Sequence, residues 1–291
     1  MMPSAQPRDG RPKRPDEGFL APALIFVSVL AAWEILTRLL DIKPYLLPSP
    51  VLIVQTVLAE WPTLFSNYRV TLSEILLGFV LAFAVAMALG ISIAHSAAFR
   101  RGVYPLIIAS QTVPMIAVAP VLIIWFGYNI IPRVLVTALI AFFPLTVTTV
   151  TGFNAVEADE VNLFRSMNGT RTQIFFKLSL PTALPFIFAG LKVSATLCVI
   201  GATVGEWIGA DRGLGHLIVL DTAQFDTPRV FASIVLLSST GVALFLIISL
   251  IERIALPWRH GKQVPDYLSL LRRRRHLPGS RTTATIPKKE A

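Results

Sequence analysis

The chain has 291 residues, of which 54% are hydrophobic and only 15% are charged. Soluble domains carry about 25% charged residues, so this composition excludes an ordinary soluble enzyme and indicates an integral membrane protein. The net charge is +9, but the cations cluster between apolar segments and at the termini, which indicates membrane topology and not nucleic-acid binding. A single cysteine, Cys198, excludes a disulfide framework and a cysteine-based metal site.

Six apolar segments have about 20 residues or more, the length that an α-helix needs to cross ~30 Å of hydrocarbon. They are expected at 19–40, 72–94, 103–126, 132–152, 184–208 and 230–256. The predicted fold class is therefore all-α, a polytopic membrane protein with about six transmembrane helices. A signal peptide is the alternative for the first segment, but its long leader and the lack of a clear cleavage site favour an uncleaved anchor.

Three parts are expected along the chain. Residues 1–18 predict a disordered basic tail, 19–258 a transmembrane domain, and 259–291 a second basic tail. Within the transmembrane domain, an amphipathic piece at 51–61 begins with Ser49-Pro50, in the manner of an N-cap followed by proline. This piece is expected to lie along the membrane surface.

The distribution of cations predicts the orientation. Lys and Arg concentrate in the leader, at Arg100-Arg101, between the fourth and fifth segments, and in the C-terminal tail. Fewer cations lie in the segments on the other side: Lys43, Arg69, Arg133, Arg212 and Arg229. Because cytoplasmic loops carry an excess of Lys and Arg, we expect both termini and the stretch 153–182 in the cytoplasm.

The stretch 153–182 is the main polar interruption of the apolar pattern. Residues 157–167 predict a short helix, with acidic residues in its first turn and an apolar stripe formed by Val161, Phe164 and Met167. Asn168-Gly169 predicts a tight turn that ends this helix. Thr170 and Gln173 have the spacing of a capping box that begins a second short helix.

The second helix of this loop is expected to carry Ile174, Phe175 and Leu178 on its apolar face and to end at Pro181 and Pro185. The two helices would form a compact projection outside the membrane. The alternative is one amphipathic helix lying between two spans, with its apolar side chains in the headgroup layer.

The spacing of this loop also matches a known motif, Glu-Ala-Ala, three residues, Gly, nine residues, Ile-x-Leu-Pro. The sequence keeps the final Leu180-Pro181 and the spacing, but has Asn162-Leu163-Phe164, Asn168 and Leu178 at the other positions. With TLSEILLGF and TVPMIAVAPVLIIWFG, the chain resembles permease subunits of bacterial ABC importers over about 72–258. It is most similar to the branch that imports nitrate, sulfonates, taurine, and thiamine-pyrimidine or riboflavin-like compounds.

The resemblance implies a transport subunit and not an enzyme. By this resemblance, two copies of the permease chain would form the substrate pathway as a homodimer in a bacterial inner membrane. Each would dock its loop on a separate ATPase subunit, and an external binding protein would deliver the substrate. The implied coupling residues are Asn162, Phe164, Arg165, Met167, Asn168, Gly169, Arg171, Ile174, Phe175, Leu180 and Pro181.

The chain itself is expected to hold no cofactor, because it has no P-loop motif; ATP and Mg²⁺ would bind to the ATPase. Its four histidines, at 95, 216, 260 and 276, lack the spacing of a metal site, and no catalytic residues are predicted. Since Asn replaces the motif's glutamate at 162, we expect Arg165 or Arg171 to supply an ionic contact with the ATPase.

Polar residues within the spans are candidates for the translocation pathway, because polar groups in lipid tend to be functional. Gln111 and Thr112 lie in the third span, and Glu206 lies in the fifth. Helix–helix hydrogen bonding is the alternative for the first two, and a position at the interface beside Trp207 is the alternative for Glu206.

Two other functional classes remain at this point. A channel or secondary transporter that works without ATP predicts internal repeats and deep charged relay residues, and neither is evident. A membrane anchor or scaffold leaves the amides and prolines of the third span unexplained. The substrate is not specified by the residues of this chain.

Overall fold

The computed structural model describes the backbone of residues 17–260 and the side chains of 21–258. The described part is helical and contains no strand, which confirms the all-α prediction. The tails predicted at 1–18 and 259–291 lie outside the residues whose side chains are described. Residues 253–291 form a separate unit, of which the end of α11 and the short helix α12 (Pro257–His260) are described.

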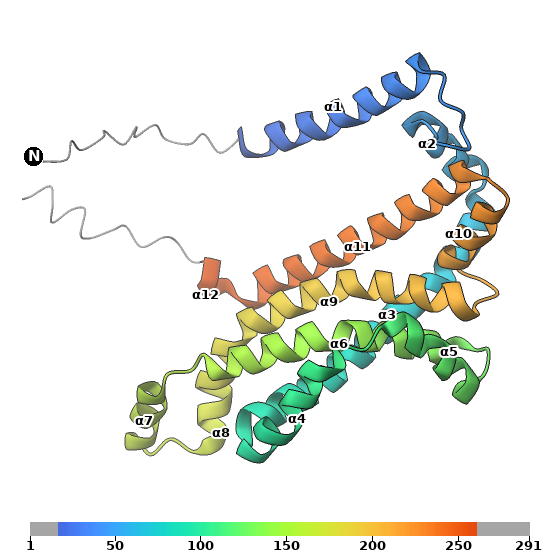
Figure 1. Ribbon diagram of the computed structural model, residues 1–291. Helices are drawn as coiled ribbons and strands as arrows, with labels where there is room; N and C mark the ends of the chain where they lie inside the picture. Colours follow the sequence, from blue (N-terminus) through green and yellow to red (C-terminus); the bar gives the residue numbers. More distant parts are fainter. Residues whose placement is uncertain (1–16, 261–291) are drawn as a thin grey trace, which may run out of the picture. The chain divides into compact units, whose positions relative to one another are not determined.

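The first unit contains α1 (Glu17–Leu39), α2 (Pro50–Ala59), α3 (Trp61–His95), α4 (Ala97–Ser110), α5 (Met115–Phe126), α6 (Ile130–Asn154), α7 (Ala158–Ser166), α8 (Arg171–Ile174), the π-helical turn η1 (Phe175–Ser179), α9 (Leu180–Gly209), α10 (Leu214–Ala223) and most of α11 (Thr227–Ala255) (Figure 1). Five of these helices are long and apolar enough to span a membrane, and α4 with α5 form a bent pair that also qualifies.

The helix starts follow the predicted capping chemistry. The Ser49 side chain accepts a hydrogen bond from Leu52 N, and Pro50 occupies the first position of α2. The second span begins at Trp61, earlier than the predicted residue 72. The predicted start was too late because hydropathy rises only after the first turns of the helix, which are polar. Proline is favoured in the first turn of a helix, and Pro62 therefore allows α3 to begin before the apolar part.

The third predicted span, 103–126, is not one helix. It divides into α4 and α5, which meet at an angle of 100° across a break after Ser110. Pro114 has an extended ψ of 108° and no N–H, and proline disfavours a helical conformation in the residue before it. The single-helix prediction was wrong because length and hydropathy are insensitive to this break.

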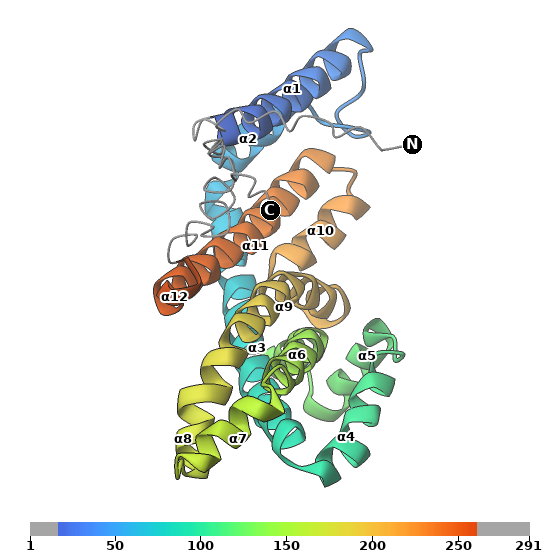
Figure 2. The same cartoon turned by 90° about the vertical axis from the view of Figure 1, so that its left-hand side faces the viewer.

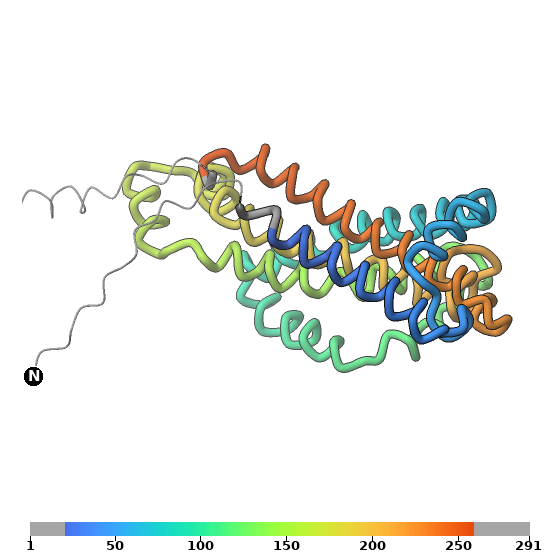
Figure 3. The backbone as a smooth tube through the Cα atoms, turned by 90° about the horizontal axis from the view of Figure 1, so that it is seen from above, coloured from blue at the N-terminus to red at the C-terminus, as the bar shows by residue number. Residues whose placement is uncertain are grey.

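Helix packing shows that the bent pair completes one crossing. Gly78 of α3 lies against Thr137 of α6, and Gly90 lies against Thr149, an equal step along both helices. Helices α3 and α6 therefore run in the same direction, so the chain between them has to return across the same thickness through α4 and α5. Six crossings follow, as predicted. Figure 3 shows α7 and α8 at the opposite end of the first unit from α10.

The core lies where α3, α6 and α9 meet side by side (Figure 2). One cluster takes two small or branched apolar residues from each helix: Ile75, Ala82, Ala138, Ala141, Cys198 and Ala202. Cys198 is fully buried there and packs as a small apolar side chain. Such small residues let helix backbones approach closely, which favours association in lipid.

We expect Gly201→Ala to destabilise the protein by about 1–3 kcal/mol, the usual range for an overpacked core. A Cβ at Gly201 would lie 2.7 Å from Thr137 Cα, a backbone atom that no rotamer change can move. The matched control is Gly102→Ala, because a Cβ there meets no atom within 4 Å. Thermal unfolding in detergent checks the difference, and equal melting temperatures for the two variants would contradict this account of the core.

Candidate functional site

The polar loop between α6 and α9 has the predicted first helix and turn. Helix α7 carries Asp159 and Glu160 in its first turn. Asn168 adopts a left-handed conformation with φ of 59°, and Gly169 N donates a 2.9 Å hydrogen bond to Phe164 O. A Cβ at Gly169 would lie 2.6 Å from that same oxygen. The Asn-Gly pair is therefore required by the turn, and its prediction is confirmed.

The second helix of the loop begins as predicted but does not end as predicted. Thr170 and Gln173 form the reciprocal hydrogen bonds of a capping box at 2.9 and 3.3 Å. The helix then continues through η1 into α9, so Pro181 and Pro185 do not terminate it. Leu180 N–H donates to Phe175 O, five residues back. This wider turn accommodates Pro181 in the first turn of α9, where a missing N–H costs little.

The apolar side chains of the loop divide between an outward and an inward face. Val161 and Phe164 are half-buried, whereas Met167 at the end of the same predicted stripe is 75% exposed. Leu163 and Phe176, which sequence periodicity did not single out, are each 60% exposed. Three large apolar side chains therefore project outward from the loop.

The other predicted loop residues also divide by exposure. Asn162, Arg165, Asn168 and Arg171 are exposed. The half-buried members are Phe164, Gly169, Ile174, Phe175, Leu180 and Pro181.

An aromatic cluster joins the loop to the ends of two spans. Phe175 of η1 stacks on Phe153 of α6, with ring centroids 5.7 Å apart and planes at 16°. His95, the last residue of α3, contacts both rings at centroid distances of 5.4 and 5.7 Å. The cluster fixes the base of the loop, and sequence spacing gave no signal for it because its members come from three distant segments.

The break between α4 and α5 contains two of the predicted pathway residues. Gln111 and Thr112 are both exposed there, and Thr112 Oγ1 donates to Ala109 O at 2.8 Å. Gln111 also borders a cavity of about 230 Å³ whose other walls come mainly from α6, with Val113, Met115 and Leu197 completing them. Irregular backbone inside a membrane is tolerated where it is buried in protein or lines a wet cavity. Their part in translocation remains a prediction.

Glu206, the third pathway candidate, is enclosed by protein with an exposed fraction of 1%. It accepts hydrogen bonds from Thr71 Oγ1 at 2.6 Å and from Gly215 N at 2.5 Å. The carboxylate thus caps the start of α10, and a Cβ at Gly213 or Gly215 would collide with it. Gly213 also has φ of 126°, a backbone conformation that favours glycine. No described contact joins Glu206 to Gln111 or Thr112.

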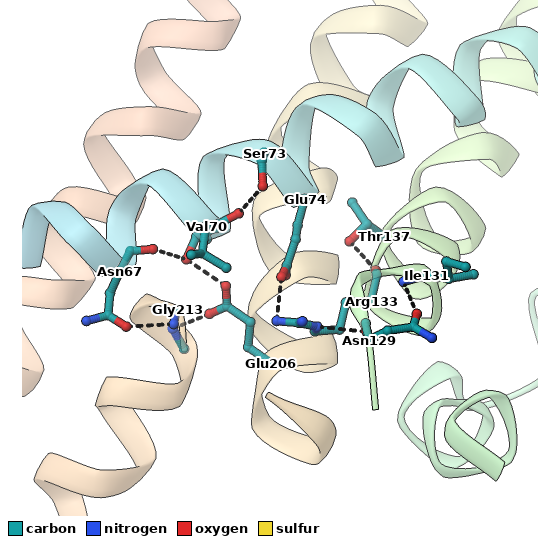
Figure 4. A network of polar contacts seen from close by, with 12 residues as sticks. Asn67, Val70, Ser73, Glu74, Asn129, Ile131, Arg133, Thr137, Glu206 and Gly213 are labelled. Carbon is teal, nitrogen blue, oxygen red and sulfur yellow. Dashed lines mark hydrogen bonds and ion pairs between the residues drawn. The ribbon is translucent and has the colours of Figure 1, made fainter. Parts of the chain in front are cut away.

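An ion pair beside Glu206 was missed by the sequence reasoning. Arg133 Nη1 lies 2.7 Å from Glu74 Oε1, and both residues are buried, with exposed fractions of 8% and 0%. Figure 4 shows Glu74 of α3 and Glu206 of α9 on the same side of Arg133 of α6. A signal was present, because opposite charges lie near the starts of two apolar segments, but the topology prediction counts Arg133 with the cations outside the spans. This network ties α3, α6 and α9 together at the end opposite the loop.

Comparison with known proteins identifies the chain. A family model described as the inner membrane component of binding-protein-dependent transport systems matches residues 86–255, more than half of the chain. The chain belongs to this family.

Two curated relatives and one solved structure define the branch and the fold. The chain is 42% identical to the formylaminopyrimidine transport permease protein ThiX of Halalkalibacterium halodurans, over 82% of this chain and 96% of the relative. It is 33% identical to the riboflavin transport system permease protein RibX of Chloroflexus aurantiacus, over 79% and 87%. A chain of the MetNI methionine ABC transporter matches with a TM-score of 0.60 at 17% identity, over 67% and 97%.

The chain is therefore a multi-pass permease subunit of an ABC importer, as the motif spacing had indicated. Its family is a transport permease family and not an enzyme family. The alternatives of an ATP-independent channel and of a membrane scaffold find no support in these comparisons.

We expect Arg133→Gln in this permease to cost about 3–5 kcal/mol, because it leaves the Glu74 carboxylate buried without a cation. The double variant Arg133→Gln with Glu74→Gln removes both charges and should recover much of the lost stability. Thermal unfolding of both variants in the same detergent measures the recovery. A double variant as unstable as the single one would show that the ion pair is not what the site requires.

Proposed function

We propose that this permease forms the substrate pathway of its importer as a homodimer and docks the loop 153–182 on a separate ATPase subunit. The loop is the observation that carries the proposal. It projects from the ends of two spans, its turn requires Asn168 and Gly169, and its base is fixed by stacked aromatic rings. A rigid projection of this kind can transmit force, whereas a flexible strip in the headgroup layer would absorb it.

The outward apolar side chains support a protein partner at the loop. Leu163, Met167 and Phe176 are 60%, 75% and 60% exposed and lie beside polar exposed residues. Interfaces commonly centre on such large side chains within a polar rim. We propose that they enter a groove of the ATPase, which supplies all of the ATP and Mg²⁺ chemistry, so that this chain needs no cofactor.

The orientation follows from charge. Loop 153–182 contains Arg165, Arg171 and Lys177, and the α3–α4 connection at the same end contains Arg100 and Arg101. The positive-inside rule favours the cytoplasm for that end. We propose a bacterial inner membrane with the loop and both termini inside, and a binding protein that approaches the α10 end from outside.

A second copy of the chain would complete the pathway. Gln111 and Thr112 are exposed in the single chain at a break within a spanning segment. Lipid leaves such irregular backbone without hydrogen-bond partners, so the break requires protein or water beside it. Two copies that face each other across this break would enclose a polar path.

The substrate we propose is a thiamine-pyrimidine-like compound of the formylaminopyrimidine kind. The support is the 42% identity to a relative that carries this substrate in its name, against 33% for the riboflavin relative. Riboflavin-like compounds, nitrate, sulfonates and taurine are the alternatives within the branch.

We expect Met167→Asp to abolish both ATPase co-purification and transport while the permease stays folded. A carboxylate at this exposed position would have to be desolvated in the proposed groove, a cost that an apolar side chain does not carry. Co-purification of the ATPase from detergent, with thermal unfolding of the permease alone, measures the two effects.

The control is Phe225→Asp at the end of the chain's first unit that holds α10. Phe225 is also 75% exposed, and its φ of 58° suits aspartate. This variant should retain the ATPase. If Met167→Asp retained it as well, the loop tip would not be the docking surface.

For the substrate, we expect proteoliposomes that contain the permease, its ATPase and its binding protein to accumulate a labelled formylaminopyrimidine only when ATP is supplied. Riboflavin, nitrate, an aliphatic sulfonate and taurine, each in excess, should not compete. Competition by one of them at equal concentration would reassign the substrate, and uptake without ATP would reject the importer mechanism.

A further inference from the structure

A cavity of about 470 Å³ lies at the base of the loop, beneath its outward side chains. Its walls come from four places in the chain: the end of α3, the end of α6, helix α7, and the α8–η1 turn. Cavities of about 300–1,000 Å³ accommodate small-molecule ligands. None of the three outward side chains, Leu163, Met167 and Phe176, lines it.

One wall of this cavity is aromatic. Phe153 and Phe175 line it as a nearly parallel stacked pair, and His95 lines it beside them. Aromatic side chains prefer offset-stacked or edge-to-face contact with another ring. This wall is therefore suited to a flat ring.

Two arginines give the cavity positive charge in addition to its aromatic wall. Arg165 of α7 and Arg171 of α8 both line the cavity. Neither guanidinium has an ion pair or hydrogen bond to any residue that the structure describes. Arginine binds carboxylate and phosphate through paired N–H donors, so two unpaired guanidinium groups at one cavity favour an anion with several oxygens.

The backbone on one side of the cavity is also unusual. Phe175 and Ser179, the first and last residues of the π-helical turn, both line it. π-Helical turns are rare and occur frequently at functional sites.

From these features we propose that the cavity binds a small anionic aromatic molecule, a flat ring that bears a phosphate or carboxylate group. The ring packs on Phe153 and Phe175, and the anion lies between Arg165 and Arg171. A ligand held in this way connects α7 to the ends of α3 and α6 and restrains the loop. The proposal concerns binding to the permease itself, and it competes with the expectation that Arg165 or Arg171 contacts the ATPase, so the test measures probe binding and ATPase co-purification separately.

The test uses the full chain in nanodiscs of phosphatidylcholine, with phenyl phosphate as the probe in isothermal titration calorimetry. We expect saturable binding of phenyl phosphate, and binding at least tenfold weaker for inorganic phosphate and for benzyl alcohol. Arg165→Gln and Arg171→Gln should each weaken binding of phenyl phosphate about tenfold or more, since each removes a charge-assisted contact. Hydrogen exchange over 158–175 should slow when the probe binds.

The matched control is Lys177→Gln, which removes the same charge from an exposed residue of η1 that does not line the cavity. It should bind phenyl phosphate as the wild type does. Thermal unfolding identifies any variant that fails to fold, and Arg171→Lys then serves as the second variant: it keeps the charge but loses the paired donors, and should bind with intermediate affinity.

Three results would overturn the proposal. The first is equal binding of inorganic phosphate and phenyl phosphate, which would reveal an unspecific charge effect. The second is loss of probe binding in nanodiscs that contain phosphatidylglycerol, which would assign the cavity to a lipid headgroup. The third is no probe binding to the folded wild type; loss of ATPase co-purification in the arginine variants would then assign the arginines to a protein carboxylate.

Discussion

The close approach of α3, α6 and α9 is the constraint on which the rest of this permease depends. Lipid tails are as apolar as the helices, so helices in a membrane gain little from hydrophobic burial and depend on packing contacts. Here Gly78 and Gly90 receive threonine side chains of α6, and Gly201 lies directly against the backbone at Thr137. Because α3 and α6 are held in parallel, the segment between them has to cross the same distance, and it does so in two pieces. The break that exposes Gln111 is thus positioned by the core beside it.

The two ends of this core are closed by different chemistry. At one end, buried charge joins three spans: Arg133 pairs with Glu74, and Glu206 binds the backbone at the start of α10. At the other end, His95, Phe153 and Phe175 join the loop to the spans through ring contacts. The buried charges resist separation because removal of one partner leaves another unpaired in a medium of low polarity. The aromatic end has no such penalty and leaves a cavity beside it.

Local rules predicted the parts of this structure that depend on a few neighbouring residues. The capping box at Thr170 and the left-handed turn at Asn168 could be located from the sequence because their partners lie within about four positions. The number of crossings followed from hydropathy. The pairing of Glu74 with Arg133 could not be predicted, since it depends on the rotation of two helices 59 residues apart in sequence. The path of the chain at Pro181 was also wrong, because a π-helical turn absorbed a residue that normally ends a helix.

The continuity of this last helix has a mechanical consequence. From Arg171 to Gly209 the chain is helical for 39 residues, about 58 Å at 1.5 Å per residue. One end bears the arginine at the base of the loop, and the other bears the carboxylate that holds the start of α10. Had Pro181 and Pro185 ended the helix, a non-helical hinge would have separated the loop from the fifth span. Because no such break exists, continuous helical backbone joins Arg171 at the loop to Glu206 at the far end.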